Sequence, residues 1–427
     1  MSIKRVIITG AGFSVPAKLP IQNKILDLMK EKPVASFMND SNPYSFKFMN
    51  AYITVGLYLL DKYSNNSYYD LMLLYKKIQK RSLENDLIES ILNDFIKEKI
   101  EVGIDAINYL NSRCFDSTQK YKELSQLVNL VRNALKTENV DVNLEDVFTS
   151  FDKSLQEKVY MDKYSYIKMD SIRLSLTRLF VYYFDQVVHS HNYNTPDYLN
   201  FIKYIKRRRS KSPLTIITTN WDTLLEEYLI KNNMHYNLCL NEKYYFEDDL
   251  INKSITYTNC KDLRLIKVHG SINWFRCLNC NMLSIYKKFK IADLLFNDEK
   301  NESCLKCNMK VDEETEMLEP EIITPTMIKS IDSQLYKNLW STASNELREA
   351  DEVIFIGYSM PVADYELRYL FQKSISPNAK IDVILYHNDD PRRVDTDINL
   401  LPEKRYKDLF PKNKIDFHYD GFRAYFN

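Results

Sequence analysis

Residues 5–14 read Arg-Val-Ile-Ile-Thr-Gly-Ala-Gly-Phe-Ser, an apolar run that stops at two closely spaced glycines. Only seven glycines occur in the 427-residue chain, and Gly270 and Gly357 also follow apolar runs. A further run, 214–219, ends on Asn-Trp-Asp at 220–222. Such runs are typical of buried parallel strands, whose carboxyl ends surround the ligand crevice of an open α/β sheet. We therefore expect these four segments to converge on one pocket.

The charge balance argues against nucleic acid as the main ligand. The chain has 58 Lys and Arg residues, 58 Asp and Glu residues, and a hydrophobic fraction of 45%. Its length suits two or three domains with ordinary cores. A zero net charge provides no general attraction to phosphate backbones, so we expect no sequence-specific nucleic acid binding. The basic run 206–209 closes a predicted helix, where cations interact favourably with the helix dipole, and a local basic patch is the alternative.

The first residues imitate a secretory signal, because Lys4 and Arg5 precede the apolar residues 6–8. Thr9 and Gly10 interrupt this apolar part, which is shorter than the roughly 7–15 residues of a signal core. No stretch approaches the roughly 18 consecutive apolar residues of a membrane span. We therefore expect a cytoplasmic protein without a membrane partner, and we interpret residues 6–8 as the first strand.

Four of the seven cysteines form two CxxC pairs, Cys277 with Cys280 and Cys304 with Cys307, separated by residues 281–303. Thiolates with this spacing are typical of a tetrahedral zinc site, in which each short turn supplies two sulfurs. Redox or structural disulfides are the alternative, but they would be unusual in a cytoplasmic protein. Four protein ligands leave no open position, so we expect Zn²⁺ to be structural rather than catalytic.

The predicted elements form an α/β chain with two interruptions. Strand-like runs at 6–8, 214–219, 263–268, 353–356 and 381–386 predict a Rossmann-like parallel sheet. Helix-like patterns occur at 21–30, 69–80, 83–99, 124–135, 171–189, 198–208, 222–231, 334–350 and 364–373. We predict that residues 1–32, 213–276 and 320–427 form the sheet domain, 33–212 a large all-helical insertion, and 277–319 a small zinc-binding module.

Each motif at the strand ends is ambiguous when taken alone. The glycines of 10–12 would let backbone N–H groups approach a pyrophosphate, but Val15 stands where a third fingerprint glycine belongs, and any tight turn accepts glycine. The Asn and Asp of 220–222 could simply cap a helix. His269 could be a satisfied core residue, and 357–359 could be an ordinary turn. Only the joint order of the motifs favours a binding site.

That joint order resembles the sirtuin family of NAD-consuming enzymes. It consists of Gly-Ala-Gly-Phe-Ser at 10–14, Thr-Asn-Trp-Asp at 219–222, Val-His-Gly at 268–270, two CxxC pairs, and Gly-Tyr-Ser at 357–359. The resemblance covers the sheet domain and the zinc module, and the helical insertion carries little of it. It implies a sirtuin-type sheet with a small zinc-ribbon module.

The resemblance also implies a role for each matching residue. His269 would be the general base, Asn220 would place the ribose or an attacking water, and Asp222 would hold the nicotinamide carboxamide. NAD⁺ would be the substrate. The other NAD-binding residues would be Gly10, Ala11, Gly12 and Ser14 at the phosphates and adjoining ribose, Gly357 and Ser359 on the adenosine side, and Asn388 at the adenine ribose.

Two departures from the protein-deacylase pattern bear on the reaction. Deacylases continue after the first motif with a Ser-Gly-Ile-Pro-Asp-Phe-Arg-like stretch, whereas residues 15–20 read Val-Pro-Ala-Lys-Leu-Pro. Their Phe-Gly-Glu segment, which helps to bind acyl-peptide, is replaced by Glu-Pro-Glu-Ile-Ile-Thr-Pro-Thr at 319–326. With the helical insertion, these changes resemble the bacterial sirtuin-like branch that hydrolyses NAD itself, typically in antiphage defence.

We therefore predict an NAD⁺ glycohydrolase (NADase) that releases nicotinamide and ADP-ribose, as an effector of antiphage defence by NAD depletion. An NAD-dependent protein lysine deacylase is the alternative, and a module that senses NAD or ADP-ribose without turnover is a third reading. The resemblance implies a homo-oligomer, with a DNA-translocase-type ATPase as a second candidate partner. In either case the helical insertion would serve as the oligomerisation or partner surface.

Overall fold

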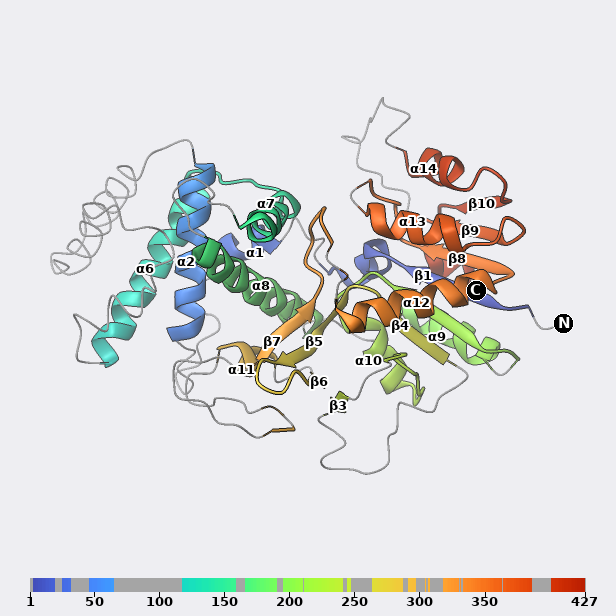
Figure 1. Ribbon diagram of the computed structural model, residues 1–427, viewed down its shortest axis with the longest axis horizontal. Coiled ribbons are helices and arrows are strands. Elements are labelled where there is room, and N and C mark those ends of the chain that lie inside the picture. The colour runs from blue at the N-terminus through green and yellow to red at the C-terminus, as the bar shows by residue number, and fades with distance from the viewer. Residues whose placement is uncertain are drawn as a thin grey trace.

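The computed structural model has a mainly helical part and an α/β part built on a parallel sheet, on the left and right of Figure 1. It describes residues 3–19, 25–31, 46–64, 117–158, 166–189, 195–209, 211–240, 244–246, 263–286, 291–296, 304, 306–307, 318–329, 331, 333–362, 364–385 and 401–426. The predicted helices at 69–80 and 83–99 and the predicted ligand Asn388 lie outside the described residues.

The large sheet has six strands in the order β10-β9-β8-β1-β2-β4. Every neighbouring pair is parallel, which confirms the predicted Rossmann-like α/β fold. The chain extends the sheet from β1 to one side and later returns to its other side, and ligands of such sheets bind where the order reverses. The strands are β1 (Arg5–Thr9), β2 (Leu214–Thr218), β4 (Leu263–Lys267), β8 (Glu352–Ile356), β9 (Lys380–Ile384) and β10 (Ile415–His418).

The sheet is covered on both faces where β2 lies, because all five residues of this strand are buried. Its isoleucines are β-branched and suit a buried strand. Helix α9 (Pro196–Arg209) packs against β2, and α12 (Gln334–Arg348) packs against β4. The other helices of this part are α10 (Leu224–Lys231), α13 (Tyr365–Ser374), α14 (Pro402–Leu409) and α15 (Gly421–Tyr425).

The helical part is built around α2 and α8, which pack against each other. Helix α6 also packs on α2, and α7 on α8. At the other end of α8 the helix reaches the small sheet, where it contacts β5 and β7 (Figure 1). The division of the chain into domains stays a prediction. The helices are α1 (Ile25–Glu31), α2 (Phe46–Tyr63), α6 (Ser117–Thr137), α7 (Leu144–Glu157), α8 (Tyr166–His189) and α11 (Ile291–Phe296).

The small sheet has the strand order β3-β6-β5-β7. Strand β5 pairs antiparallel with both β6 and β7. It begins one residue after His269, so the small sheet and the edge strand β4 of the large sheet frame this histidine from both sides in sequence. The strands are β3 (Tyr244–Phe246), β5 (Gly270–Cys277), β6 (Leu283–Ile285) and β7 (Leu318–Ile322).

The segment after β1 forms a 3-10 helix, η1 (Ala11–Ala17), which the sequence analysis did not predict. Its backbone is in direct contact with the turn after β8, because Gly12 N donates to Gly357 O at 2.8 Å. A Cβ atom added to Gly12 would lie 2.6 Å from Gly357 Cα. Two side-chain-free positions thus let the ends of β1 and β8 touch.

Gly357→Ala should destabilise the protein by about 2–4 kcal/mol, since it adds a left-handed backbone penalty to a steric clash. Gly357 has a φ of +61°, and its Cβ would lie 2.3 Å from Gly12 C. Denaturant unfolding measures the effect. Ser359→Ala, at an exposed position of the same turn, is the control and should unfold like the wild type. A Gly357→Ala variant as stable as the wild type would contradict the close contact between the two backbones.

Candidate functional site

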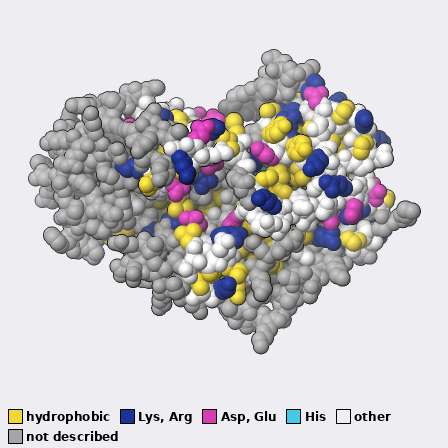
Figure 2. All heavy atoms as spheres, viewed as in Figure 1, with side chains coloured by type: hydrophobic (Ala, Val, Ile, Leu, Met, Phe, Trp, Pro, Cys, Tyr) yellow, Lys and Arg dark blue, Asp and Glu magenta, His cyan; other side chains and the backbone are white. Residues whose placement is uncertain are grey.

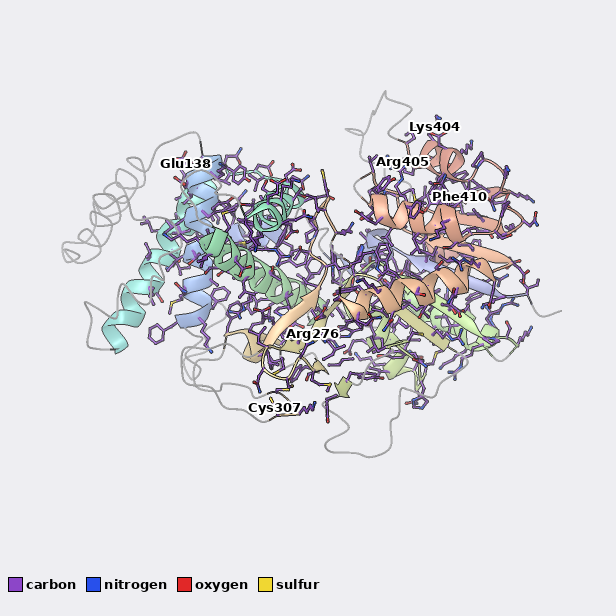
Figure 3. The ribbon with its side chains drawn as sticks, viewed as in Figure 1. Glu138, Arg276, Cys307, Lys404, Arg405 and Phe410 are labelled. Carbon is purple, nitrogen blue, oxygen red and sulfur yellow. The ribbon has the colours of Figure 1, made fainter. Side chains whose placement is uncertain are left out.

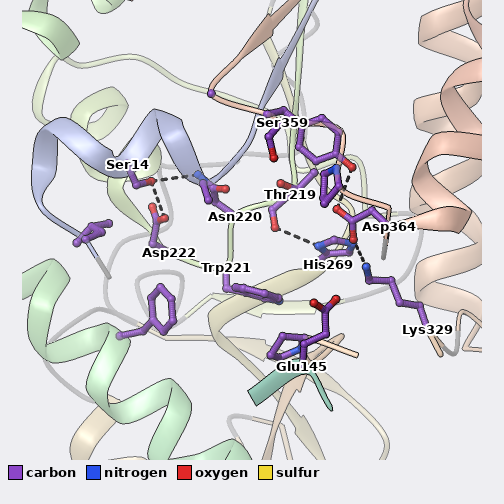
Figure 4. Close-up of a pocket in the computed structure, with 17 residues that line it drawn as sticks. Ser14, Glu145, Thr219, Asn220, Trp221, Asp222, His269, Lys329, Ser359 and Asp364 are labelled. Atoms are coloured by element: carbon purple, nitrogen blue, oxygen red, sulfur yellow. Dashed lines mark hydrogen bonds and ion pairs between the residues drawn. The ribbon is translucent and has the colours of Figure 1, made fainter. Parts of the chain in front are cut away.

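The carboxyl ends of β1, β2, β4 and β8 open onto one cavity of about 250 Å³. Most of the predicted catalytic and NAD-binding residues line it, as Figure 4 shows. Gly10 and Gly12 do not line the cavity. The carbonyl of Gly10 instead accepts a hydrogen bond from the side chain of Asn220, which does line it. The predicted residues that line the cavity are Ala11, Ser14, Asn220, Asp222, His269, Gly357 and Ser359.

One side of the cavity, which we call the amide side, consists of Ser14, Asn220 and Asp222. The amide nitrogen of Asn220 donates to Gly10 O and to Ser14 Oγ, both at 3.0 Å. Ser14 Oγ in turn donates to Asp222 Oδ2 at 2.9 Å. The side-chain nitrogen of Asn220 is directed toward Ser14. Its side-chain oxygen therefore points away from Ser14 in Figure 4, where it is available to a ligand.

Asp222 is held from behind by a buried cation that the sequence analysis did not single out. Lys267 Nζ donates to the carbonyl of Asp222 at 2.6 Å and to Glu226 Oε1 at 2.5 Å. Asp222 Oδ1 also accepts from Leu224 N, the first residue of helix α10, at 3.0 Å, so Asp222 contacts the start of this helix as well as lining the cavity. Burial raises the pKa of Asp222, and Lys267 opposes this rise. The loop 220–222 is therefore fixed before any ligand binds.

His269 has one engaged and one unengaged ring nitrogen. Its Nδ1 lies 3.1 Å from Thr219 O, and because a carbonyl can only accept, Nδ1 carries the proton in the neutral ring. Nε2 is buried and makes no hydrogen bond to any described residue. Burial and, secondarily, Lys329 lower the pKa of His269 to about 4, although Asp364 opposes them. The neutral imidazole thus carries its lone pair on Nε2, and the residue lines the cavity.

Trp221 fixes the plane of this imidazole. The two rings are stacked, with centroids 5.9 Å apart and an interplanar angle of 26°. Trp221 Nε1 donates to Ile323 O at 2.8 Å, and Phe180 of α8 packs edge-on against the indole. The helical part therefore packs against Trp221, which in turn stacks on His269.

The other side of the cavity, which we call the charged side, contains three ionisable residues that sequence reasoning missed. They are Glu145, Lys329 and Asp364, and they lie beside His269 in Figure 4. Asp364 is paired with Lys329 and accepts a hydrogen bond of 2.9 Å from Tyr358 OH. Burial alone would raise the pKa of Asp364, but Lys329 and His269 outweigh it and lower this pKa. No spacing in the sequence relates these residues, because three separate segments supply them.

The four predicted metal ligands form a cluster outside the pocket. The sulfur atoms of Cys277, Cys280, Cys304 and Cys307 all lie within 4.8 Å of one another. Cys277 and Cys307 are 3.9 Å apart and Cys280 and Cys304 are 3.5 Å apart, close to the roughly 3.8 Å that tetrahedral Zn–S bonds impose. None of them forms a disulfide, and Figure 3 shows Cys307 at the edge of the small sheet, beyond Arg276. The cluster is compatible with a structural zinc site.

Residues 214–404 match the family model of the SIR2-like domain. This match supports the sirtuin family. It contains three of the four strand-end motifs and both CxxC pairs, whereas residues 10–14 and most of the helical part lie outside it. A comparison with curated proteins gives no significant match.

Solved sirtuin structures are also similar to this chain at low identity. Sir2Tm bound to a propionylated peptide is 13% identical, with 58% of this chain and 75% of that chain covered and a TM-score of 0.31. A mutant Sir2 homologue in complex with ADP-ribose is 14% identical, with 99% and 88% covered and a TM-score of 0.32. A Sir2 homologue in complex with NAD is 16% identical, with 58% and 70% covered and a TM-score of 0.30.

The described surface carries both signs of charge. In Figure 2 the basic and acidic side chains are interspersed over the face shown, in keeping with their equal numbers in the sequence. Within the described parts of the chain, no helix is both long and apolar enough to cross a membrane.

Proposed function

We propose that this protein hydrolyses NAD⁺ at the bond between nicotinamide and ribose, giving nicotinamide and ADP-ribose. One observation carries the proposal: His269, whose Nε2 has no hydrogen-bond partner among the described residues, lines the same cavity as the fixed Ser14–Asn220–Asp222 network at the carboxyl ends of the strands. The SIR2-like domain match supports NAD as the substrate. The amide side would receive the nicotinamide half of the dinucleotide.

The charge of the leaving group suits a site that works with the amide of Asn220 and a neutral imidazole. Nicotinamide in NAD⁺ carries a positive charge and leaves as a neutral molecule, so cleavage needs no proton donor. The bond breaks through an oxocarbenium-like centre at C1′ of the ribose, which a nucleophile attacks from the opposite face. The protein has to hold this centre, stabilise its charge and supply the nucleophile.

His269 would accept a proton from a ribose hydroxyl. Its low pKa keeps the ring neutral at physiological pH, and its stacking on Trp221 fixes the direction of Nε2. A neutral base that faces a hydroxyl can share the proton as positive charge develops on the sugar. The fixed imidazole would thus accept the proton while the C1′–N bond lengthens.

Asn220 would orient the ribose or the attacking water without adding charge. A carboxylate at this position could combine with the oxocarbenium centre, whereas an amide can only donate and accept hydrogen bonds. Its nitrogen is held by Gly10 and Ser14, so little conformational freedom is lost when substrate binds. Asp222 would hold the carboxamide of nicotinamide.

Purified protein should release nicotinamide from NAD⁺ in the absence of any peptide, and Asn220→Ala should reduce this release by about 100-fold without unfolding the protein. Chromatography of the products measures nicotinamide and ADP-ribose, with and without an acetyl-lysine peptide. Release that requires the peptide would favour the deacylase. Tight binding of intact NAD⁺ without release, measured by calorimetry, would favour a sensor.

We further propose that the reaction serves antiphage defence by NAD depletion, since the departures from the deacylase pattern resemble that branch. In such a role the protein would be an oligomer or would work beside a DNA-translocase-type ATPase, because uncontrolled NAD loss would kill the cell. Infected cells that express the wild type should lose NAD, whereas cells that express Asn220→Ala should keep it. NAD levels that do not change on infection would contradict this role.

A further inference from the structure

The helical part supplies one wall of the pocket. Glu145 of α7 and Phe184 of α8 line the cavity beside residues of the α/β part. Helix α7 is tied to the segment that carries Lys329, because Thr149 Oγ1 accepts a hydrogen bond of 2.9 Å from Met327 N. Arg173 of α8 adds a second link, and the wall is therefore a fixed part of the site.

This second link joins three chain segments. Arg173 Nε donates to Asp152 Oδ1 of α7 at 2.6 Å, and Arg173 Nη2 donates to Thr324 Oγ1 at 3.4 Å. Asn143 caps the start of α7, and its Oδ1 accepts from Glu145 N at 3.1 Å. The first turn of α7, which carries Glu145, is thus capped at its start and anchored along its length.

Glu145 differs from the other carboxylates of the cavity in its lack of a hydrogen-bond or ion-pair partner among the described residues. Asp364 is occupied by Lys329 and Tyr358, and Asp222 by Ser14 and Leu224. The carboxylate of Glu145 forms no hydrogen bond or ion pair with any residue in the described parts of the chain, although it is half-buried in the cavity wall.

We propose that Glu145 is the catalytic residue that deprotonates the attacking water, an inference that rests on the proposed NAD⁺ hydrolysis. The water oxygen forms a bond to C1′ of the ribose as the C1′–N bond breaks and its electron pair passes to the nicotinamide nitrogen. The water proton goes to the carboxylate of Glu145 and then to solvent. The products are nicotinamide, ADP-ribose and one proton.

The arrangement of charge supports this assignment. The Lys329–Asp364 pair is internally neutral, so Glu145 leaves the charged side of the cavity with one net negative charge. An ionised carboxylate with no ion-pair partner among the described residues can accept the proton of a water molecule. Burial raises the pKa of Glu145, although the positive charge of Lys329 opposes this rise. The higher pKa makes this carboxylate a stronger base than an exposed one. The proposed function assigns the ribose hydroxyl to Nε2 of His269, the ring nitrogen without a partner among the described residues, so the water needs a separate base.

The assignment is tested by comparing hydrolysis with nicotinamide exchange. In exchange, labelled nicotinamide attacks C1′ and re-forms NAD⁺ without an attacking water and without the proton transfer assigned to Glu145. We expect Glu145→Gln to reduce hydrolysis by about 100-fold and to change exchange by less than about threefold. Asp146→Asn, which removes an exposed carboxylate from the same turn of α7, is the matched control and should change both rates by less than about twofold.

The other outcomes of this comparison would contradict either the role of Glu145 or the proposed function. Equal losses of hydrolysis and exchange in Glu145→Gln would assign Glu145 a merely structural role, and unchanged hydrolysis would assign it no role in the reaction. Either result would overturn the inference and leave the proposed function in place. A wild type that needs peptide to release nicotinamide would overturn the proposed function and, with it, a catalytic role for water.

Discussion

His269→Ala should lower nicotinamide release from NAD⁺ by about 10²–10⁴-fold, the usual contribution of a positioned general base. His269 lines the cavity, its Nε2 has no hydrogen-bond partner among the described residues, and its Nδ1–H is committed to Thr219 O. Because the substitution removes the ring but leaves the amide side untouched, we expect catalysis to fall more than binding. Steady-state rates at saturating NAD⁺ measure the first effect, and calorimetric titration measures the second.

A matched control separates this loss from a general effect of histidine removal. His235 is exposed and follows helix α10, so His235→Ala should keep wild-type activity. Activity of His269→Ala close to that of the wild type would contradict the role of the imidazole. A loss shared equally by both variants would contradict it as well.

The same variant should alter the pH dependence of stability. The pKa of His269 is about 4 in the folded protein against an ordinary value of 6.5. Between these values the unfolded chain binds a proton that the folded chain does not, so the free energy of unfolding rises with pH across this window. The stability that depends on the neutral His269 is therefore lost as the pH falls from about 6.5 toward about 4. Denaturant unfolding at several pH values should show a weaker dependence in His269→Ala.

The strands that end at the pocket could be predicted because each is a short apolar run followed by a turn motif. Strands β1, β2, β4, β8 and β9 all lie where the runs predicted them. Strand β10 was missed because Ile415–His418 alternates apolar and charged or polar residues and all four are only half-buried. Edge strands with partial burial leave a weaker sequence pattern than central ones.

The amide side and His269 could be predicted for a different reason, since they directly follow strands that share one edge of the sheet. The charged side could not. Glu145 belongs to a helix, Lys329 follows β7 and Asp364 precedes α13, so only tertiary packing brings them together. Lys267 was missed because a lysine in a predicted strand is normally assigned to the surface, whereas here the Glu226 pair buries it.

Cys304→Ser should remove the bound zinc and lower the melting temperature on the order of 10 °C, because structural zinc sites contribute folding free energy directly. Serine cannot replace a thiolate as a soft ligand, so the remaining three sulfurs would hold the metal weakly. Elemental analysis should find one zinc per wild-type chain and much less in the variant. Cys239→Ser, which changes a cysteine outside the cluster, should retain the metal.

The loss should also reach the pocket, because the strands next to the cluster frame the proposed catalytic residues. Strand β5 runs from Gly270, next to His269, to the ligand Cys277, and β7 pairs with it. The residue after β7, Ile323, donates its N–H to His269 O at 2.9 Å and accepts the indole N–H of Trp221. Zinc removal should therefore lower NAD⁺ cleavage although no metal enters the cavity. Full activity in metal-free, folded protein would show that this frame stands without the ion.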